Sequence, residues 1–413
     1  MAAAPTDVRK VMRKLIPFLL LLLSLNVQGQ IVDGYTTDFP VAMQEPRWVD
    51  QVRTRLENMM SDRLLQSTQL GLMVYDLTDN EVVYTLNERQ RQRPASVMKL
   101  VTAITALDML GGDYCYYTSL CYKGTIVGDT LRGSLYCVGG FDPTVNQDDI
   151  RYMVNDIRRA GISNIDGMVV ADLTMKDTLI YGSGWCWDDD NYQLTPLLVD
   201  KKDQFLTVLL REMRSQGIGL NVTLGKGKVP QNCTEVVRYR TGIDKVLSRM
   251  MKDSDNLYAE SMFYQVAHAN STNPGRAADA SSAVKRLLSR LGLDPVNYTI
   301  ADGSGLSLYS YVTAEMLVKL LRYAYDNKAI YTHLYPALPI AGVDGTLGNR
   351  MKTGACYNNV RAKTGTVSGV STLAGYCVGS NGHELCFAIL NQGLIKASDG
   401  RAFQDRICEA LCR

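Results

Sequence analysis

Hydrophobic residues form short strand-like runs near both ends of the chain. GLMVYDL (Gly71–Leu77) and EVVYTL (Glu81–Leu86) flank a Thr-Asp-Asn turn, which predicts two neighbouring strands. Towards the other end, Val360–Val378 reads as one long strand, and Glu384–Leu390 follows after an Asn-Gly turn. We therefore expect one α/β domain that is closed by strands from both ends of the chain.

Between these strands, apolar residues recur every three or four positions, which is typical of amphipathic helices. The clearest example runs from Ser96 to Leu110, where Val97, Leu100, Val101, Ile104, Leu107 and Leu110 predict one apolar face. Further helices are predicted over Glu45–Leu64, Ile243–Lys252, Leu257–Ala269 and Ser398–Leu411.

The pattern changes to short β-like runs and turns over residues 116–240. Strand-like runs lie within Gly124–Gly140 and Gly167–Leu173, and a helix is predicted over Asp148–Gly161. We interpret 116–240 as a smaller, β-rich inserted α/β module, and residues 30–115 with 241–413 as the host domain. Within the module, Gly225–Lys228 lacks the third glycine of a dinucleotide-binding fingerprint and predicts a hairpin turn.

Residues 1–29 read as a secretory signal. Basic residues between 9 and 14 precede an apolar run, Leu15–Leu25, and Val27-Gln28-Gly29 offers a small-residue cleavage site. The run is shorter than the ~20 residues that a membrane-spanning helix needs, and no later segment is long and apolar enough. We expect an exported, periplasmic protein that is cleaved near Gly29 and has no membrane span in the mature chain.

Net charge and the numbers of histidines and cysteines limit which partners and cofactors we expect. Lys and Arg number 44 against 42 Asp and Glu, a net charge of +2, so nothing favours a nucleic-acid partner. The three histidines (His268, His333 and His383) are far apart and no CxxC occurs, so we expect no metal and no cofactor. The ten cysteines read equally well as disulfide partners in an exported protein or as buried small side chains. Cys377 and Cys386, on either side of a turn, are one candidate pair.

Ser96-Val97-Met98-Lys99 places a hydroxyl and an amine three residues apart at the start of a helix. This spacing puts both groups on one helical face, within reach of each other. A serine becomes a nucleophile when a base takes its proton, and a lysine can be that base if burial lowers its pKa. A pattern this short recurs by chance, so it carries weight only with further motifs.

Two further motifs raise that weight. Ser254-Asp255-Asn256 lies at a junction between predicted helices, and Lys363-Thr364-Gly365-Thr366 lies in the terminal strand, where Gly365 would let a substrate backbone approach. In this order, S-x-x-K, S-D-N and K-T-G are the signature of penicillin-recognising serine acyltransferases. A second K-T-G, Lys352-Thr353-Gly354, has loop-like surroundings and is interpreted as a surface turn.

On these motifs, the sequence resembles the low-molecular-weight penicillin-binding proteins of the D-alanyl-D-alanine carboxypeptidase/endopeptidase type, which carry a large insert after the nucleophile helix. The matching stretches are Ala95–Ala103, Gly133–Val145, Ser254–Glu260, Asp302–Ser307, Ala341–Leu347 and Arg361–Tyr376. Leu308 and Ser310 stand where the family commonly has Arg and Asn. The resemblance implies a transpeptidase/β-lactamase-like fold, an antiparallel sheet with flanking helices.

The resemblance also implies a mechanism. Ser96 attacks the carbonyl of the penultimate D-Ala of a peptidoglycan stem peptide, and Lys99 accepts the serine proton. The backbone N–H groups of Ser96 and Thr366 form the oxyanion hole, and Ser254 and Lys363 relay a proton to the leaving amine. Water then releases the acyl group, whereas a β-lactam acylates Ser96 and inhibits the enzyme.

The substrate-binding residues follow from the same resemblance. Asn256 is expected to hold the substrate amide, and Lys363 and Thr364 to bind its terminal carboxylate. Gly365 and Thr366 are expected to complete the substrate-binding strand.

Two alternative functions remain open. A β-lactamase or esterase uses the same three motifs but releases its acyl group quickly. A non-catalytic module that binds cell wall or senses β-lactams would bind without turnover.

Overall fold

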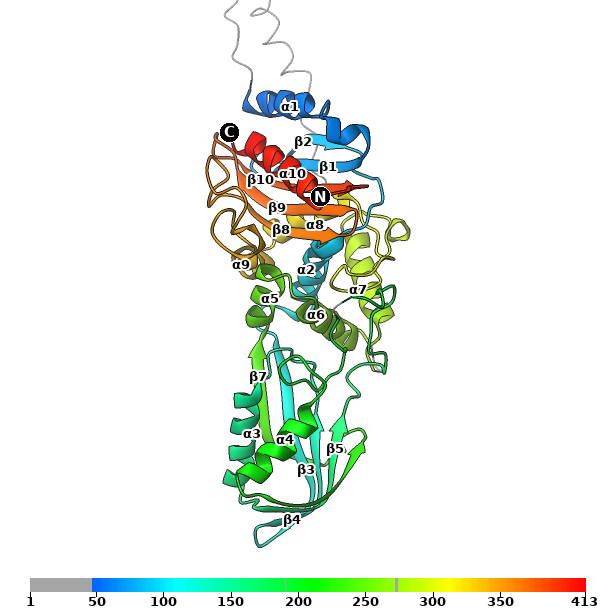
Figure 1. The fold of residues 1–413 in the computed structure, drawn as a ribbon, viewed down its shortest axis with the longest axis vertical. Helices are drawn as coiled ribbons and strands as arrows, with labels where there is room; N and C mark the ends of the chain where they lie inside the picture. The colour runs from blue at the N-terminus through cyan, green and yellow to red at the C-terminus, as the bar shows by residue number, and fades with distance from the viewer. Residues whose placement is uncertain (1–46, 190, 272–273) are drawn as a thin grey trace, which may run out of the picture. The chain divides into compact units, whose positions relative to one another are not determined.

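The computed structural model describes residues 47–189, 191–271 and 274–413, so the signal predicted over residues 1–29 lies outside the described residues. Residues Arg47–Arg413 form one compact unit that contains two five-stranded sheets (Figure 1). Among the described residues, no helix combines the length and the apolar character that crossing a bilayer requires.

Strands from both ends of the described chain build the first sheet, in the order β2-β1-β10-β9-β8, with every pair antiparallel. Its strands are β1 (Gln69–Asp76), β2 (Glu81–Leu86), β8 (Arg361–Val367), β9 (Val370–Val378) and β10 (Glu384–Gln392). The α/β prediction is therefore confirmed. The single long strand predicted over Val360–Val378 is wrong, because a turn at Gly369, where φ is +77°, folds β8 back against β9.

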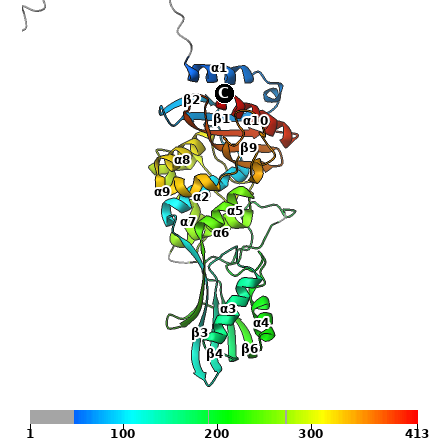
Figure 2. The same ribbon diagram turned by 90° about the vertical axis from the view of Figure 1, so that its left-hand side faces the viewer.

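Helices cover both faces of the first sheet (Figure 2). Leu72 and Val74 of β1 pack in one core with α1 (Trp48–Met59) and α10 (Ala397–Cys412). The alternate residues Met73 and Tyr75 belong to a second core with the helices of the opposite face. Because both faces are buried, the central strands read as near-continuous hydrophobic runs rather than as alternating ones.

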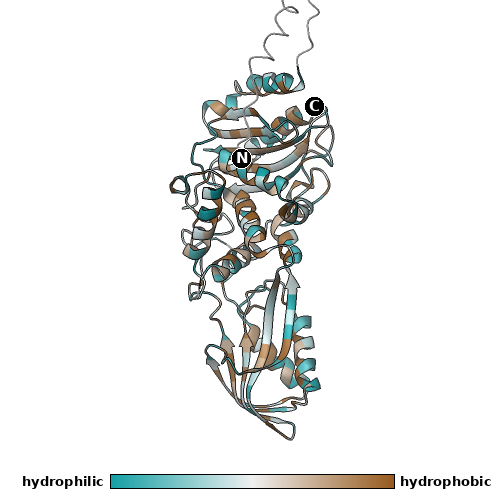
Figure 3. Ribbon diagram, turned by 180° about the vertical axis from the view of Figure 1, so that it is seen from behind, coloured by the Kyte–Doolittle hydropathy of each residue, from teal (hydrophilic) through white to brown (hydrophobic). Residues whose placement is uncertain are grey.

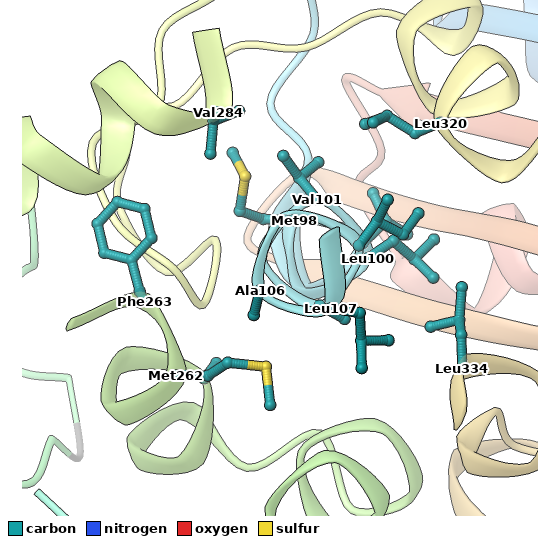
Figure 4. Close-up of a cluster of buried hydrophobic side chains, with 14 of the residues drawn as sticks. Met98, Leu100, Val101, Ala106, Leu107, Met262, Phe263, Val284, Leu320 and Leu334 are labelled. Atoms are coloured by element: carbon teal, nitrogen blue, oxygen red, sulfur yellow. The ribbon is translucent and has the colours of Figure 1, made fainter. Parts of the chain in front are cut away.

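Helix α2 (Met98–Leu110) is the centre of this second core. The helices around it are α5 (Ile243–Lys252), α6 (Asn256–Ala269), α7 (Ala277–Arg290), α8 (Ala314–Asp326) and α9 (Lys328–Ala337). Figure 4 looks along α2 and shows Met262, Val284, Leu320 and Leu334 approaching it from different sides. The prediction of one apolar face is therefore too narrow, since every residue from Met98 to Leu107 is buried.

The second sheet has the order β6-β5-β4-β3-β7 and is mixed, because β4–β5 and β5–β6 are parallel pairs. Its elements are β3 (Cys115–Val127), β4 (Thr130–Val138), α3 (Gln147–Arg159), β5 (Asn164–Asp172), α4 (Phe205–Ser215), β6 (Gly219–Lys226) and β7 (Thr234–Gly242). Helices α3 and α4 pack with these strands in a third core, and Figure 3 shows hydrophilic and hydrophobic residues along α3, at the right-hand edge of this sheet.

The connections of the second sheet correct one prediction. Gly225–Lys228 is not a hairpin turn, because β6 is an edge strand and the chain crosses from it to β7 at the opposite edge. Cys115 at the start of β3 and Gly242 at the end of β7 are cross-strand partners. The chain therefore enters and leaves this sheet at neighbouring points.

The geometry of the first sheet also tests the suggested disulfide between Cys377 and Cys386. All ten cysteines are free thiols in the structure. Cys377 and Cys386 lie on adjacent strands, but Cys377 packs in the core under α10 and Cys386 in the core around α2. Their side chains point to opposite faces of the sheet, so the suggested pairing is wrong.

The central place of α2 predicts a large cost for a cavity in it. Leu100 is fully buried, so Leu100→Ala is expected to lower the free energy of unfolding by ~2.5–5 kcal/mol, measured by urea unfolding. The control is Ile395→Ala, at a side chain that is 99% exposed, which should change stability by less than ~0.5 kcal/mol. Equal effects of the two changes would contradict the central role of α2.

Candidate active site

The structure brings residues of all three motifs together with Ser304 into one cluster, in which Lys99 and Lys363 are buried and Ser96, Ser254 and Asn256 are half-buried. Lys99 is fully buried in the first turn of α2. Its Nζ donates to Ser96 Oγ at 3.0 Å, to Asn256 Oδ1 at 2.7 Å and to the Ser304 carbonyl at 2.9 Å. Burial lowers the pKa of Lys99 to about 8, although the charges of Asp302 and Glu260 oppose the shift. A neutral amine beside the serine hydroxyl is therefore accessible.

Ser96 lies in a tight 3-10 turn, Ala95–Val97, immediately before α2. Ala95 has φ +48°, a left-handed conformation that is costly for a residue with a Cβ. Thr372 Oγ1 donates to the Pro94 carbonyl at 2.8 Å, which ties this turn to β9. The local strain is thus held in place by the sheet behind it, as is common at functional sites.

Gly365 explains how closely the edge strand β8 approaches the nucleophile turn. A Cβ at this position would lie 2.8 Å from the Ser96 backbone nitrogen and 2.2 Å from Thr372 Oγ1. From the sequence, we expect Gly365 to leave room for a substrate backbone beside the strand. The structure gives another reason for this glycine, which is direct contact between β8 and the turn that carries Ser96.

Ser254-Asp255-Asn256 forms the short connection between α5 and α6. Ser254 has φ +58°, which turns the chain sharply. Asp255 caps α6 by accepting the backbone N–H groups of Leu257 and Tyr258. Such caps are typical of helix starts, and this one fixes Asn256 in the first turn, with its side chain on Lys99.

Lys363 completes the cluster from β8. It is fully buried, and its Nζ donates to Ser254 Oγ at 2.8 Å and to the Thr364 carbonyl at 2.8 Å. Burial lowers its pKa well below the usual range, and the nearby Lys99 lowers it further. The half-exposed Thr364 donates from its hydroxyl to Thr346 Oγ1, and Thr366 is exposed.

Sequence reasoning assigned no role to the residues that support Lys99 from behind. Glu260 accepts the backbone N–H groups of Gly303 and Ser304, which holds the Ser304 carbonyl against Lys99. Burial and the neighbouring Asp302 raise the pKa of Glu260 to about 8. Both carboxylates lie in stretches that match the family, but only the folded chain shows that Ser304 contacts the lysine.

The segment after β5 also reaches the site. Trp185 Nε1 donates to Asp302 Oδ2 at 3.0 Å, and Lys201 forms an ion pair with Asp255. A cavity of about 180 Å³ is lined by Trp185, Asn191, Tyr192, Leu194, Lys201, Asp255, Asn256 and Leu257. It therefore opens beside Asn256, whose side chain contacts Lys99.

Two other groupings lie apart from this cluster. Lys352-Thr353-Gly354 is in an exposed loop, as its sequence context predicts. Within the described ranges, the only grouping with metal-ligand spacing is Asp76, Asp79 and His383. Asp76 already accepts the Thr78 backbone N–H and bonds His383 Nδ1 at 2.8 Å, an arrangement that supports the β1–β2 turn.

Comparison with known proteins gives consistent matches. The family model of D-Ala-D-Ala carboxypeptidase 3 (S13) matches residues 52–199 and 195–413. A D-alanyl-D-alanine carboxypeptidase of Actinomadura sp. is 26% identical, covering 83% of this chain and 81% of that protein. A carboxypeptidase of Mycobacterium tuberculosis is 30% identical, covering 77% of this chain and 74% of that protein.

Solved structures agree in fold. Penicillin-binding protein 4 of Haemophilus influenzae superposes with a TM-score of 0.78 at 22% identity, covering 88% of this chain and 98% of that one. A predatory endopeptidase of Bdellovibrio bacteriovorus gives a TM-score of 0.57 at 17% identity, covering 82% and 91%. The penicillin-recognising fold expected from the sequence is confirmed.

The tight approach of β8 predicts that Gly365→Ala misplaces the nucleophile turn. We expect a loss of ~1–3 kcal/mol in unfolding free energy from overpacking, and a clear loss of Ser96 labelling by a fluorophosphonate probe. The matched control is Ser368→Ala, an exposed position in the turn that follows β8, which should change neither readout. Normal labelling and stability of Gly365→Ala would show that the contact does not constrain Ser96.

Proposed function

The chain belongs to the D-Ala-D-Ala carboxypeptidase 3 (S13) family and is a serine-type D-Ala-D-Ala carboxypeptidase/endopeptidase of the penicillin-binding kind, and we propose that Ser96 carries its acyl-enzyme. The observation that carries this proposal is the 3.0 Å hydrogen bond between Lys99 Nζ and Ser96 Oγ in a site where burial lowers the pKa of Lys99 to about 8, which makes the neutral amine accessible near neutral pH. In the neutral form, Lys99 takes the Ser96 proton as Oγ attacks the substrate carbonyl.

The oxyanion hole consists of the backbone N–H groups of Ser96 and Thr366. The close contact of Gly365 with the Ser96 nitrogen supports this assignment, because it brings β8 against the nucleophile turn. Preorganised donors of this kind typically contribute ~2.7–4 kcal/mol to transition-state stabilisation. β8 is the edge strand of its sheet, so a peptide can lie beside it as an added strand.

Ser254 and Lys363 deliver a proton to the leaving amine. Lys363 Nζ donates to Ser254 Oγ, and the depressed pKa of Lys363 suits a group that gives up a proton readily. Asn256 holds the substrate amide, while Lys363 and Thr364 bind the carboxylate of the terminal D-Ala. A leaving D-Ala makes the reaction a carboxypeptidase step, and a leaving cross-link amine makes it an endopeptidase step.

Peptidoglycan stem peptides are the proposed substrates and β-lactams the proposed inhibitors. A structure of the Haemophilus influenzae protein has been solved in complex with a β-lactam, which supports the inhibitor assignment. The buried carboxylates nearest to Lys99, Glu260 and Asp302, are occupied by donors of the 303–310 loop and by Trp185. We therefore expect slow release of a β-lactam adduct rather than the fast turnover of a β-lactamase.

We also propose that the protein acts after export, in the periplasm, following cleavage near Gly29. The basic region and the apolar run at the start of the sequence support this location. Residues 116–240 are proposed as a module inserted into the peptidase domain formed by residues 30–115 and 241–413.

Intact-protein mass after exposure to benzylpenicillin tests the role of Ser96. The mature protein is expected to gain one penicillin that persists for hours, and Ser96→Ala to gain none. The same variant should lose at least ~10³-fold in kcat/KM on a D-Ala-D-Ala peptide.

Other outcomes would favour the alternatives. Rapid return to the unmodified mass with hydrolysed drug would indicate a β-lactamase. If the wild type neither forms an adduct nor turns over drug or peptide, but binds muropeptides, the non-catalytic module would be the correct reading.

The pKa of Lys99 predicts the pH dependence of acylation. A lysine acts as a base only when neutral, so the acylation rate should rise with pH through about 8 and fall about tenfold per pH unit below it. Asp302→Asn removes the largest negative charge effect that raises the Lys99 pKa, so its midpoint should move to lower pH. The measurement is the stopped-flow rate of β-lactam acylation, with folding checked at each pH.

Glu260 provides the control for this assignment, because its own pKa is also raised to about 8. A pH dependence that persists in Glu260→Gln, with its midpoint moved to lower pH because the Glu260 charge also raises the Lys99 pKa, assigns the titration to Lys99. A rate that becomes independent of pH in that variant would assign it to the carboxyl group instead.

A further inference from the structure

Exposed aromatic side chains are concentrated beside the entrance to the active site. Of the eight exposed aromatic side chains among the described residues, five lie in two short segments, 179–192 and 308–311. We call these five the aromatic patch: Tyr181, Trp187, Tyr192, Tyr309 and Tyr311. Trp187 is 96% exposed, so packing within this chain does not account for it. Clusters of exposed apolar side chains commonly mark interaction sites.

Hydrogen bonds hold the two segments of the patch side by side. The backbone N–H of Leu308 donates to the Gly184 carbonyl, and Ser307 Oγ donates to the Ser183 carbonyl at 2.7 Å. A Cβ at Gly184 would lie 2.7 Å from the Tyr309 ring, so that ring packs directly on the Gly184 backbone. The two segments that carry the patch therefore lie side by side, although they are distant in sequence.

The patch is continuous with the catalytic cluster. Tyr192 lines the cavity that also contains Asn256, whose side chain bonds Lys99. Trp185, between Tyr181 and Trp187 in sequence, lines the same cavity and bonds Asp302. A substrate bound at Ser96 can thus extend from this cavity onto the aromatic patch.

The charge and side-chain chemistry of the aromatic patch indicate which class of ligand it can bind. Residues 177–200 and 302–318 contain no lysine or arginine, and Lys201, whose amine lies 5.2 Å from the centre of the Tyr192 ring, is already paired with Asp255. This disfavours nucleic acids, anionic lipids and other polyanions. Flat aromatic rings offer an apolar surface to the C–H faces of a sugar ring. The exposed carboxylate of Asp188 and the side chain of Asn191 can accept hydrogen bonds from hydroxyl and amide groups. These features together suit an uncharged, N-acetylated sugar chain.

We propose that the aromatic patch binds the glycan strand of peptidoglycan, to which the cleaved stem peptide is attached. This inference rests on the proposed function, because it places the sugar part of the same substrate next to the site that cleaves its peptide. Binding at the patch increases the local concentration of stem peptides at Ser96 and adds affinity for polymeric substrate without a role in the chemistry.

The test compares substrates with and without sugar, using the whole mature protein. For Trp187→Ala and for Tyr181→Ala/Trp187→Ala, kcat/KM on a disaccharide-linked pentapeptide is expected to fall at least fivefold. Hydrolysis of a sugar-free D-Ala-D-Ala peptide should stay within twofold of wild type. Tyr152→Ala on α3, which removes a side chain that is 67% exposed and lies outside the patch, is the matched control and should change neither rate. Trp187→Tyr should restore most of the loss, because it keeps a flat ring.

A binding assay removes the chemistry altogether. In a Ser96→Ala background, the protein should co-sediment with glycan strands stripped of their peptides, and Trp187→Ala should weaken this binding. Equal losses on both substrates, no loss on either, or no binding to bare glycan would overturn the proposal. A wild type that is inactive on the sugar-free peptide and is not acylated by penicillin would instead refute the proposed function.

Discussion

The rest of the site depends on one constraint, which is the burial of two lysine amines. Both amines are removed from water, and no carboxylate is in contact with either. Lys99 and Lys363 are fully buried, and neither has an ion-pair partner within the described residues. Their hydrogen-bond acceptors are neutral hydroxyl, amide and carbonyl oxygens. Burying a charge without a counter-charge is expensive, so burial lowers the pKa of both amines and makes the neutral form that Lys99 needs as a base easier to reach.

The surrounding fold holds this unfavourable arrangement together. Ala95 and Ser254 adopt left-handed backbone conformations next to the groups that react, and each is fixed by neighbouring elements. Helix α2 anchors Lys99 because it is packed by helices on several sides, and Thr372 of β9 ties down the turn before Ser96. Strain of this kind persists only where the rest of the structure overdetermines it.

Much of the fold and the reactive cluster could be predicted from the sequence, for identifiable reasons. Strands β1 and β2 follow from two apolar runs on either side of a turn, helix α5 follows from a pattern of period 3.6, and Lys99 and Ser96 are joined by a spacing of three residues. Contacts that link distant segments could not be predicted in this way. The hydrogen bond from Lys99 to the Ser304 carbonyl and the contact of Gly365 with Ser96 depend on tertiary packing. A local sequence pattern carries no information about such packing. The turn at Gly369 was missed because apolar residues continue on both sides of it.

The pairing of Cys115 with Gly242 has an evolutionary consequence. Because the chain leaves the proposed host domain and returns to it at directly opposite residues of one antiparallel ladder, the host needs only the equivalent of a hairpin at that point. The far end of this sheet can be lengthened, trimmed or exchanged over generations without moving a residue of the Lys99 cluster, provided that two sets of contacts are kept. These are the contacts of Gly140 and Phe141 with α6 and those of the loop around Trp185 and Lys201. Selection can therefore act on the insert for one purpose while it preserves the host for another.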